Sequence, residues 1–214
     1  MLKAKDFRMQ AWNAKTGKWG TLALTAFVMS IISGLCAGLT AIGIGAIVSL
    51  IITGPLTLGL VAQSVKVIKG EDVAVGDLFS GFGRFLEAFL AHLLVTIFTA
   101  LWSLLFVIPG IIKSYSYSMT FYVLNDNPGM AANDARKKSM EIMRGNKWRL
   151  FCLDFSFIGW YLLSILTFGI LMFWITPYHN AARAAFYKSI TASETPAEAP
   201  SENEVGEVSE SAAE

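Results

Sequence analysis

Apolar residues form three long blocks along the chain, residues 19–65, 85–124 and 148–182, and polar stretches separate the blocks. The first block contains no Lys, Arg, Asp, Glu or His. A helix needs about 20 apolar residues to cross a bilayer, so each block is too long for one straight crossing. A surface helix of a soluble protein would show polar residues at helical period, which the first block lacks. The pattern therefore predicts a membrane protein.

Residues that stop helices or permit tight turns interrupt each block near its middle, at Gly38–Gly45, Val107–Ile111 and Leu166–Ile170. We therefore predict an all-α membrane protein with six transmembrane helices in three hairpins. The predicted helices span residues of about 19–39, 45–66, 85–108, 109–125, 148–166 and 170–188. The second helix of each hairpin contains or begins with a helix breaker: Pro55, Pro109 with Gly110, and Pro177.

A polar segment precedes each hairpin. Residues of about 2–15 and 130–144 place small or apolar side chains on one helical face, which predicts helices that lie on the membrane surface. A cation followed by an aromatic residue then marks the start of each hairpin, as expected for side chains at the interface. These interface markers are Lys18–Trp19, Arg84–Phe85 and Lys147–Trp148. The recurrence predicts a threefold internal repeat within a membrane domain of residues 1–190.

The distribution of cations predicts the orientation. In the six-helix arrangement, every Lys and Arg except Lys113 lies on one side, which the positive-inside rule makes cytoplasmic, together with both termini. A five-helix alternative, in which the last block crosses once, moves Arg183 and Lys188 outside. Residues 191–214 contain seven Glu and no Lys or Arg, which predicts a disordered acidic tail.

Composition narrows the function classes. Hydrophobic residues make up 54% of the chain and charged residues 15%, against about 25% charged in soluble domains. Common catalytic and nucleotide-binding motifs are missing from the sequence. We therefore predict that the protein is not an enzyme and binds no cofactor. Cys36 and Cys152 are far apart and favour small buried hydrophobes over a metal site. Topology and anionic lipid account for the basic loops, so we expect no nucleic-acid partner.

Ionisable side chains inside apolar blocks are the candidates for function, because burying charge in a membrane is costly. They are Glu87, His92, Lys113, Asp154, His179 and Arg183. Three of them, Glu87, Lys113 and Arg183, lie near predicted helix ends and favour structural roles at the interface. His92, Asp154 and His179 lie deeper, about two turns from the cytoplasmic edge of their predicted helices. A contact between Asp154 and a histidine would serve either as an interhelical hydrogen bond or as a proton or substrate contact.

Five separated motifs, in order, resemble the bacterial integral-membrane family called domain of unknown function 975. They are GPLTLGL (54–60), DLFSGF (77–82), IPGIIKSYSYSM (108–119), GNKWRLFCLDFSFIGW (145–160) and TPYHNAARAAFY (176–187). The resemblance implies a multi-pass protein of the cytoplasmic membrane of a Gram-positive bacterium. The family is distantly similar to the membrane domain of some glycerophosphodiester phosphodiesterases, whose catalytic domain this sequence lacks. The resemblance supplies no catalytic residues.

These observations leave three functional hypotheses. The first is a non-enzymatic scaffold or accessory factor that binds membrane lipid or other membrane proteins. The second is a small transporter with a polar path that uses Asp154, His92 or His179. The third and least favoured is a lipid-modifying enzyme, which would need the deep polar residues to converge within hydrogen-bond distance. The small-molecule substrate and the oligomeric state do not follow from the sequence.

Overall fold

The computed structural model describes residues 4–14, 19–40, 45–105, 107–167 and 169–192, and all regular structure in these ranges is helical. The predicted all-α class is thus confirmed for the described part of the chain. The helices are α1 (Ala4–Ala14), α2 (Trp19–Thr40), α3 (Gly45–Lys69), the 3-10 helix η1 (Val75–Arg84), α4 (Phe85–Leu105), α5 (Val107–Tyr117), α6 (Thr120–Asp126), α7 (Ala132–Ile142), α8 (Lys147–Phe155), α9 (Ile158–Leu166) and α10 (Met172–Ala192).

Four stretches of the described chain are long and apolar enough to cross a membrane: Trp19–Gly38, Ile47–Lys69, Val75–Leu104 and Lys147–Leu166. They support a membrane protein and include the first helix of every predicted hairpin. The predicted crossings at 109–125 and 170–188 are not among them. The first is divided into short helices, and α10 carries several polar residues in its middle. The count of six crossings therefore stays a prediction.

The second predicted hairpin differs from the prediction at its returning helix. Its first helix ends at Leu105 rather than at 108, and the expected helix 109–125 is two helices, α5 and α6. The division lies where hydroxyl groups bond to the preceding turn. The Ser118 hydroxyl donates to the Tyr115 carbonyl at 2.8 Å, and the Thr120 hydroxyl donates to the Tyr117 carbonyl at 2.7 Å. Such bonds compete with the regular helical pattern.

The third predicted hairpin also departs from the prediction. The expected helix 148–166 is divided into α8 and α9 at Ser156 and Phe157. The Ser156 hydroxyl donates to the Leu153 carbonyl at 2.7 Å, and Arg8 donates to the Ser156 carbonyl at 3.3 Å. The final helix, α10, continues to Ala192, beyond the predicted start of the acidic tail at 191. The rest of that tail, residues 193–214, lies outside the described residues.

Two predicted interfacial segments form helices. The first is α1, and the second is α7, which packs against α4, α5 and α6. The face of α7 predicted to be apolar is buried, including Ala132, Ala135 and Ile142. The location of α1 and α7 at a cytoplasmic membrane surface stays a prediction. Among the interface markers, Trp19 and Phe85 are the first residues of α2 and α4, and Lys18 lies outside the described residues.

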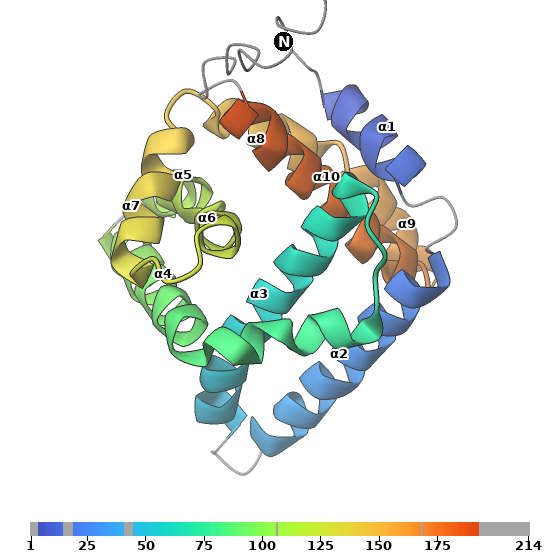
Figure 1. The fold of residues 1–214 in the computed structure, drawn as a ribbon, viewed down its shortest axis with the longest axis horizontal. Helices are drawn as coiled ribbons and strands as arrows, with labels where there is room; N and C mark the ends of the chain where they lie inside the picture. Colours follow the sequence, from blue (N-terminus) through green and yellow to red (C-terminus); the bar gives the residue numbers. More distant parts are fainter. Residues whose placement is uncertain (1–3, 15–18, 41–44, 106, 168, 193–214) are drawn as a thin grey trace, which may run out of the picture.

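The polar segments before the hairpins follow one rule of packing (Figure 1). The segment before the second hairpin, η1, packs on α3 of the first hairpin. The segment before the third, α7, packs on α6 of the second. The segment before the first, α1, packs on α10, the last helix of the third. We call each predicted hairpin together with its preceding polar segment a unit. Each polar segment packs on the hairpin of the unit before it, and α1 packs on the last unit, so the contacts close a ring.

Two glycines allow η1 to approach α3 closely. A Cβ atom added to Gly59 on α3 would lie 1.8 Å from the carbonyl oxygen of Leu78. A Cβ atom added to Gly81 on η1 would lie 2.0 Å from the carbonyl oxygen of Pro55. Only glycine permits backbones to meet at this separation. The spacing within GPLTLGL and DLFSGF thus places η1 across α3 in direct backbone contact.

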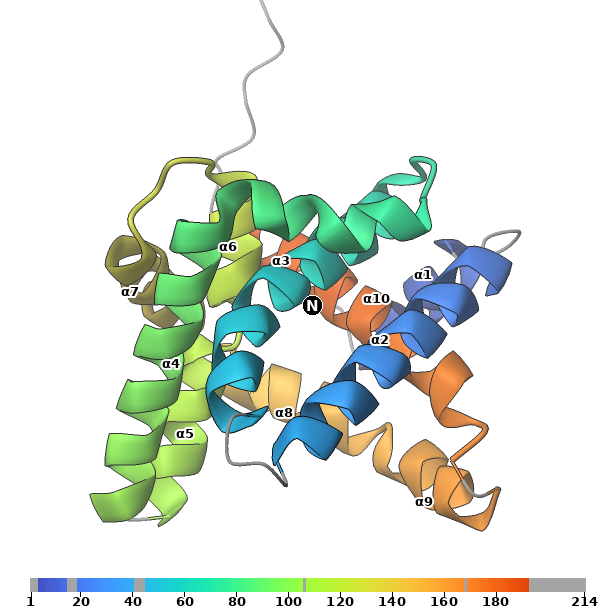
Figure 2. The ribbon, with the colours of Figure 1, turned by 90° about the horizontal axis from the view of Figure 1, so that it is seen from below.

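Three helices, α3, α6 and α10, lie towards the centre, and the outer helices expose apolar side chains. α3 contacts α6 and α10, and the Tyr122 and Tyr187 rings of α6 and α10 meet. In contrast, Leu104 of α4 and Leu166 of α9 are 87% and 77% exposed. Such surfaces fit a lipid environment. α2 and α3 diverge from their ends at Thr40 and Gly45, with α10 packed against both (Figures 1 and 2).

Candidate functional site: a polar cluster and adjoining cavities

The structure brings three of the predicted candidate residues together, at a contact between α8 and α10. His179 Nε2 lies 2.8 Å from Asp154 Oδ1. Arg183 donates from Nε to the same oxygen at 3.1 Å and from Nη2 to Oδ2 at 2.5 Å. The side chains of Asp154, His179 and Arg183 are 16%, 15% and 30% exposed. The two-point bond from Arg183 fixes the plane of the carboxylate as well as its charge.

A tyrosine from α9 completes this polar cluster. The Tyr161 hydroxyl lies 2.9 Å from His179 Nδ1. A neutral histidine satisfies both contacts if Tyr161 donates to Nδ1 and the protonated Nε2 donates to Asp154, an assignment inferred from the hydrogen-bond network. Every charged group then has a partner, because Arg183 neutralises Asp154. The arrangement ties α8, α9 and α10 together across the break in the third hairpin.

The other predicted candidates lie apart from this cluster. The His92 ring on α4 lies 6.4 Å from the ring of Phe121. Glu87 faces Arg84 at 3.8 Å, one turn earlier along the chain. The Lys113 ammonium lies over the Trp102 ring, 4.8 Å from its centre. The structural role of Glu87 and Lys113 stays a prediction, whereas Arg183 is a member of the cluster. His179 and Arg183 are four residues apart on α10, a spacing that places them on one face. That spacing is the sequence signal that could have placed Arg183 beside His179. No sequence signal could have placed Tyr161 there.

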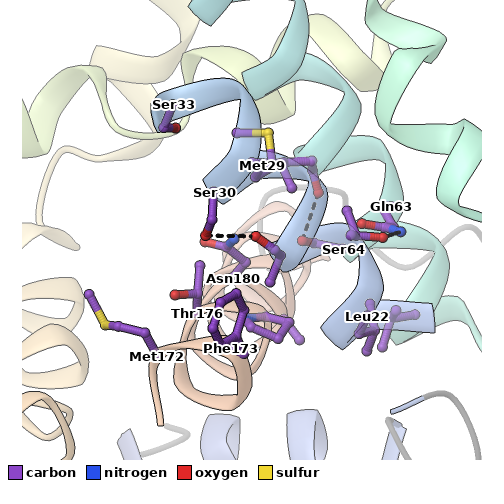
Figure 3. Close-up of a pocket in the computed structure, with 16 residues that line it drawn as sticks. Leu22, Met29, Ser30, Ser33, Gln63, Ser64, Met172, Phe173, Thr176 and Asn180 are labelled. Carbon is purple, nitrogen blue, oxygen red and sulfur yellow. Dashed lines mark hydrogen bonds between the residues drawn. The ribbon is translucent and has the colours of Figure 1, made fainter. Parts of the chain in front are cut away.

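A cavity of about 410 Å³ lies between α2, α3 and α10 (Figure 3). Apolar side chains from the three helices form much of its wall, among them Leu22, Met29, Leu60, Met172 and Phe173. Uncharged polar side chains form the rest: Thr25, Ser30, Ser33, Gln63, Ser64, Thr176 and Asn180. Figure 3 shows Ser30, Ser64 and Asn180, from three separate helices, close to one another at this cavity. The volume lies within the range of about 300–1,000 Å³ that is usual for ligand pockets.

A second, central cavity of about 120 Å³ adjoins the first, because Leu60, Ser64 and Asn180 line both. It lies where α3 and α10 meet the break between α5 and α6. Its lining is more polar and includes Thr57, Ser118, Tyr122 and Arg183. Arg183 therefore joins the polar cluster to the central cavity. The two cavities together offer an apolar space that leads to a smaller hydrogen-bonding space.

Comparison with known proteins identifies the family. The family model described as "Protein of unknown function (DUF975)" matches the chain at residues 1–113 and again at residues 104–194. The chain belongs to the DUF975 family. The matches to DUF975 cover every helix of the described structure and confirm the family resemblance of the motifs. No curated protein and no solved structure matches the chain.

Membership of DUF975 assigns no activity to the chain. Within the described ranges, no group of three or more His, Cys, Asp and Glu residues has a geometry that could hold a metal ion. The polar cluster contains one carboxylate and one imidazole, both bonded to neighbouring side chains. The cavities supply hydroxyl and amide groups with an apolar wall. This arrangement suits binding of an amphipathic molecule.

Proposed function

We propose that this DUF975 protein is a non-enzymatic membrane protein that binds a lipid-like amphiphile between α2, α3 and α10. The cavity of about 410 Å³ between these helices carries the proposal. An apolar chain would lie along Leu22, Met29 and Phe173, and its polar head would reach Ser64 and Asn180, at the boundary with the central cavity. Most ligand pockets combine such an apolar wall with a few placed polar groups.

The chemistry of the lining favours an uncharged polar head. The polar residues around the larger cavity are all Ser, Thr, Asn and Gln. Some of their donors already bond to the protein: the Ser30 and Ser64 hydroxyls donate to the carbonyls of Ala26 and Leu60, at 3.0 and 2.8 Å. Their oxygens keep lone pairs that accept from a ligand hydroxyl. Arg183 is neutralised by Asp154, so it does not demand an anion. A head with hydroxyl groups, such as glycerol, fits these partners.

Saturable binding of a pyrene-labelled monoacylglycerol to the purified protein in detergent micelles tests this role. We expect saturable fluorescence that unlabelled monoacylglycerol displaces. Ala26→Phe places a ring in the cavity wall and should weaken binding at least tenfold. Ala37→Phe makes the same change at an exposed position of α2 outside the cavity lining and should leave binding unchanged.

Two results would contradict the amphiphile site. Wild-type protein that shows no saturable fluorescence has no site for this class of ligand. Equal affinity of the Ala26→Phe and Ala37→Phe variants would place the ligand elsewhere on the protein. Identification of lipids that copurify from native membrane would then extend the test to ligands with other heads.

For the polar cluster we propose a packing role rather than a proton relay or a catalytic one. Asp154 and His179 converge, as a relay or a lipid-modifying enzyme would need, but their polar atoms bond to Arg183, Tyr161 and each other. Neither residue lines the α2–α3–α10 cavity.

A transporter remains the second hypothesis, and proton-flux assays on Asp154→Asn in liposomes test it. Loss of flux in that variant, with the fold intact, would favour transport through the cluster.

A further inference from the structure

A third cavity, of about 320 Å³, lies at the ends of α3, α6 and α10. Its lining includes Lys69 of α3, Asn125 and Asp126 of α6, and Lys188 of α10. The same three helices line the central cavity, which contains Ser118 and Arg183. Both cavities therefore lie between the second helices of the three units. We call the third one the outer cavity because it lies at the ends of these helices, and the name does not refer to a side of the membrane.

The outer cavity lies above the central cavity along all three helices. On α3, the lining passes from Ser64 to Val65 and Lys69, and on α10 from Arg183 to Tyr187 and Lys188. On α6, it passes from Tyr122 to Asn125 and Asp126. The order along the chain is the same each time, and the step is about one helical turn. The two cavities are thus stacked in the direction in which α3, α6 and α10 run.

A pair of tyrosines separates the two stacked cavities. Tyr122 lines the central cavity, Tyr187 lines the outer one, and their ring centres lie 5.2 Å apart. Tyr122 is 5% exposed and Tyr187 is 3% exposed, so both rings are buried where the linings of the two cavities meet. Two aromatic rings in contact at this point would block a polar molecule, and a change of side-chain rotamer at either tyrosine would be one way to remove the block.

We infer that the three cavities form one route through the protein, closed in this state by the Tyr122–Tyr187 pair. The route begins between α2 and α10, passes Ser64 and Asn180, and ends at Lys69 and Lys188. Hydroxyl, amide and guanidinium groups along the central part suit a small uncharged group that forms hydrogen bonds. The protein would thereby pass a small uncharged molecule, or the polar head of an amphiphile, between the α2–α3–α10 cavity and the outer cavity at Lys69, Asp126 and Lys188. This activity goes beyond binding; it shares the α2–α3–α10 cavity with the proposed amphiphile site, but its test needs no bound amphiphile.

Cysteine accessibility in lipid nanodiscs tests the route. The background variant carries Cys36→Ser and Cys152→Ser, and Ser118→Cys then reports on the central cavity. The probe is 2-sulfonatoethyl methanethiosulfonate, a charged reagent that lipid excludes. Labelling should be slow while the tyrosine pair is intact. Tyr187→Ala should accelerate it at least tenfold, because it opens the outer cavity to the central one, and Tyr122→Ala should do the same.

Matched variants make the result decisive. Tyr187→Phe and Tyr122→Phe keep both rings and remove only a hydroxyl group, so neither should accelerate labelling. Asn125→Cys, in the outer cavity, should react rapidly in every background and sets the upper rate. Equal rates in Tyr187→Ala, Tyr122→Ala and the parent would overturn the route. So would labelling of Ser118→Cys at the rate of Asn125→Cys while both tyrosines are present.

Discussion

At the scale of single residues, one carboxylate organises the interior of the third unit. Asp154 accepts two hydrogen bonds from Arg183 and one contact from His179, and it is mostly shielded from solvent. A buried ion pair of this kind contributes little net stability compared with apolar packing, but removal of one partner leaves an uncompensated charge. Removal of one member of the cluster should therefore lower the free energy of unfolding by much more than the intact cluster raises it.

Asp154→Asn should destabilise the protein by about 3–5 kcal/mol, because Arg183 is left without a countercharge. Thermal unfolding in detergent measures the change, and the expected fall in Tm is on the order of 10 °C. Asp134→Asn is the control, since Asp134 is 62% exposed and pairs with Lys137 only at 3.6 Å. That substitution should change stability by less than about 0.5 kcal/mol.

The double variant Asp154→Asn with Arg183→Met separates lost charge pairing from lost packing. It removes both charges and keeps a long side chain, so it should recover a large part of the loss. If Asp154→Asn unfolds at the wild-type temperature, the ion pair does not hold α8 to α10. If the double variant is no better than the single one, the loss arises from the hydrogen bonds to His179 and not from the unpaired guanidinium.

At the scale of elements, the contact between η1 and α3 is made by backbone. Gly59 and Gly81 leave no space for a side chain at the crossing, and Gly54 approaches Ala88 of α4 in a similar way, with a built Cβ 2.6 Å from its carbonyl oxygen. Close packing of this kind depends on glycine, because the space at the crossing excludes the Cβ atom that any other residue would add. The GPLTLGL motif thus positions η1 and α4 through glycines rather than through large side chains.

Gly59→Ala should separate η1 from α3 and lower stability by at least about 2 kcal/mol, towards the upper range for overpacked cores. Gly34→Ala is a matched control on α2, where a Cβ would meet nothing within 4 Å. That change should be neutral or stabilising by up to about 1 kcal/mol, because alanine favours helix. Chemical or thermal unfolding of the two variants gives the comparison. Equal stability would mean that η1 is not in backbone contact with α3.

The sequence predicted most of the helices and only part of the site, for physical reasons. Apolar length gave α2, α3 and α4, because spanning a bilayer requires about 20 apolar residues. The breaks at Ser118 and Ser156 were missed, since a single hydroxyl that bonds to the preceding turn leaves no trace in hydropathy. The pairing of Asp154 with His179 was anticipated as one option. The role of Tyr161 depends on how α9 packs against α10, which no local pattern encodes.

At the scale of the whole molecule, the ring of contacts makes the N-terminal helix part of the last unit. Phe7 of α1 is 1% exposed and its ring lies 5.4 Å from that of Phe186 on α10. The Tyr178 hydroxyl donates to the Arg8 carbonyl at 3.1 Å. The two matches to the family model support an internal repeat in part, and its threefold form stays a prediction that the repeated packing rule favours. A ring of this kind should lose cohesion wherever one contact is removed.

Phe7→Ala should release α1 from α10 and destabilise the protein by about 3–5 kcal/mol, the usual cost of deleting a buried ring. Limited proteolysis provides the measurement: cleavage near α1 should become faster, together with cleavage near the end of α10. Met9→Ala changes a residue of the same helix that is 52% exposed and should leave the pattern unchanged. Faster cleavage at α1 alone would show that α10 is held without the N-terminal helix.

The ring also places the ends of α3, α6 and α10 on one face, and the topology prediction depends on that face. Lys69, Asp126 and Lys188 line the same outer cavity, so these three ends lie on one side of the molecule. The positive-inside rule predicts that this side is cytoplasmic. Reporter fusions after residue 40, after residue 75 and after the last residue should therefore read outside, inside and inside. Since α10 ends beside α3, an external C-terminus together with an internal residue 75 would contradict the arrangement of the third unit, whereas reversal of all three reporters would contradict only the orientation.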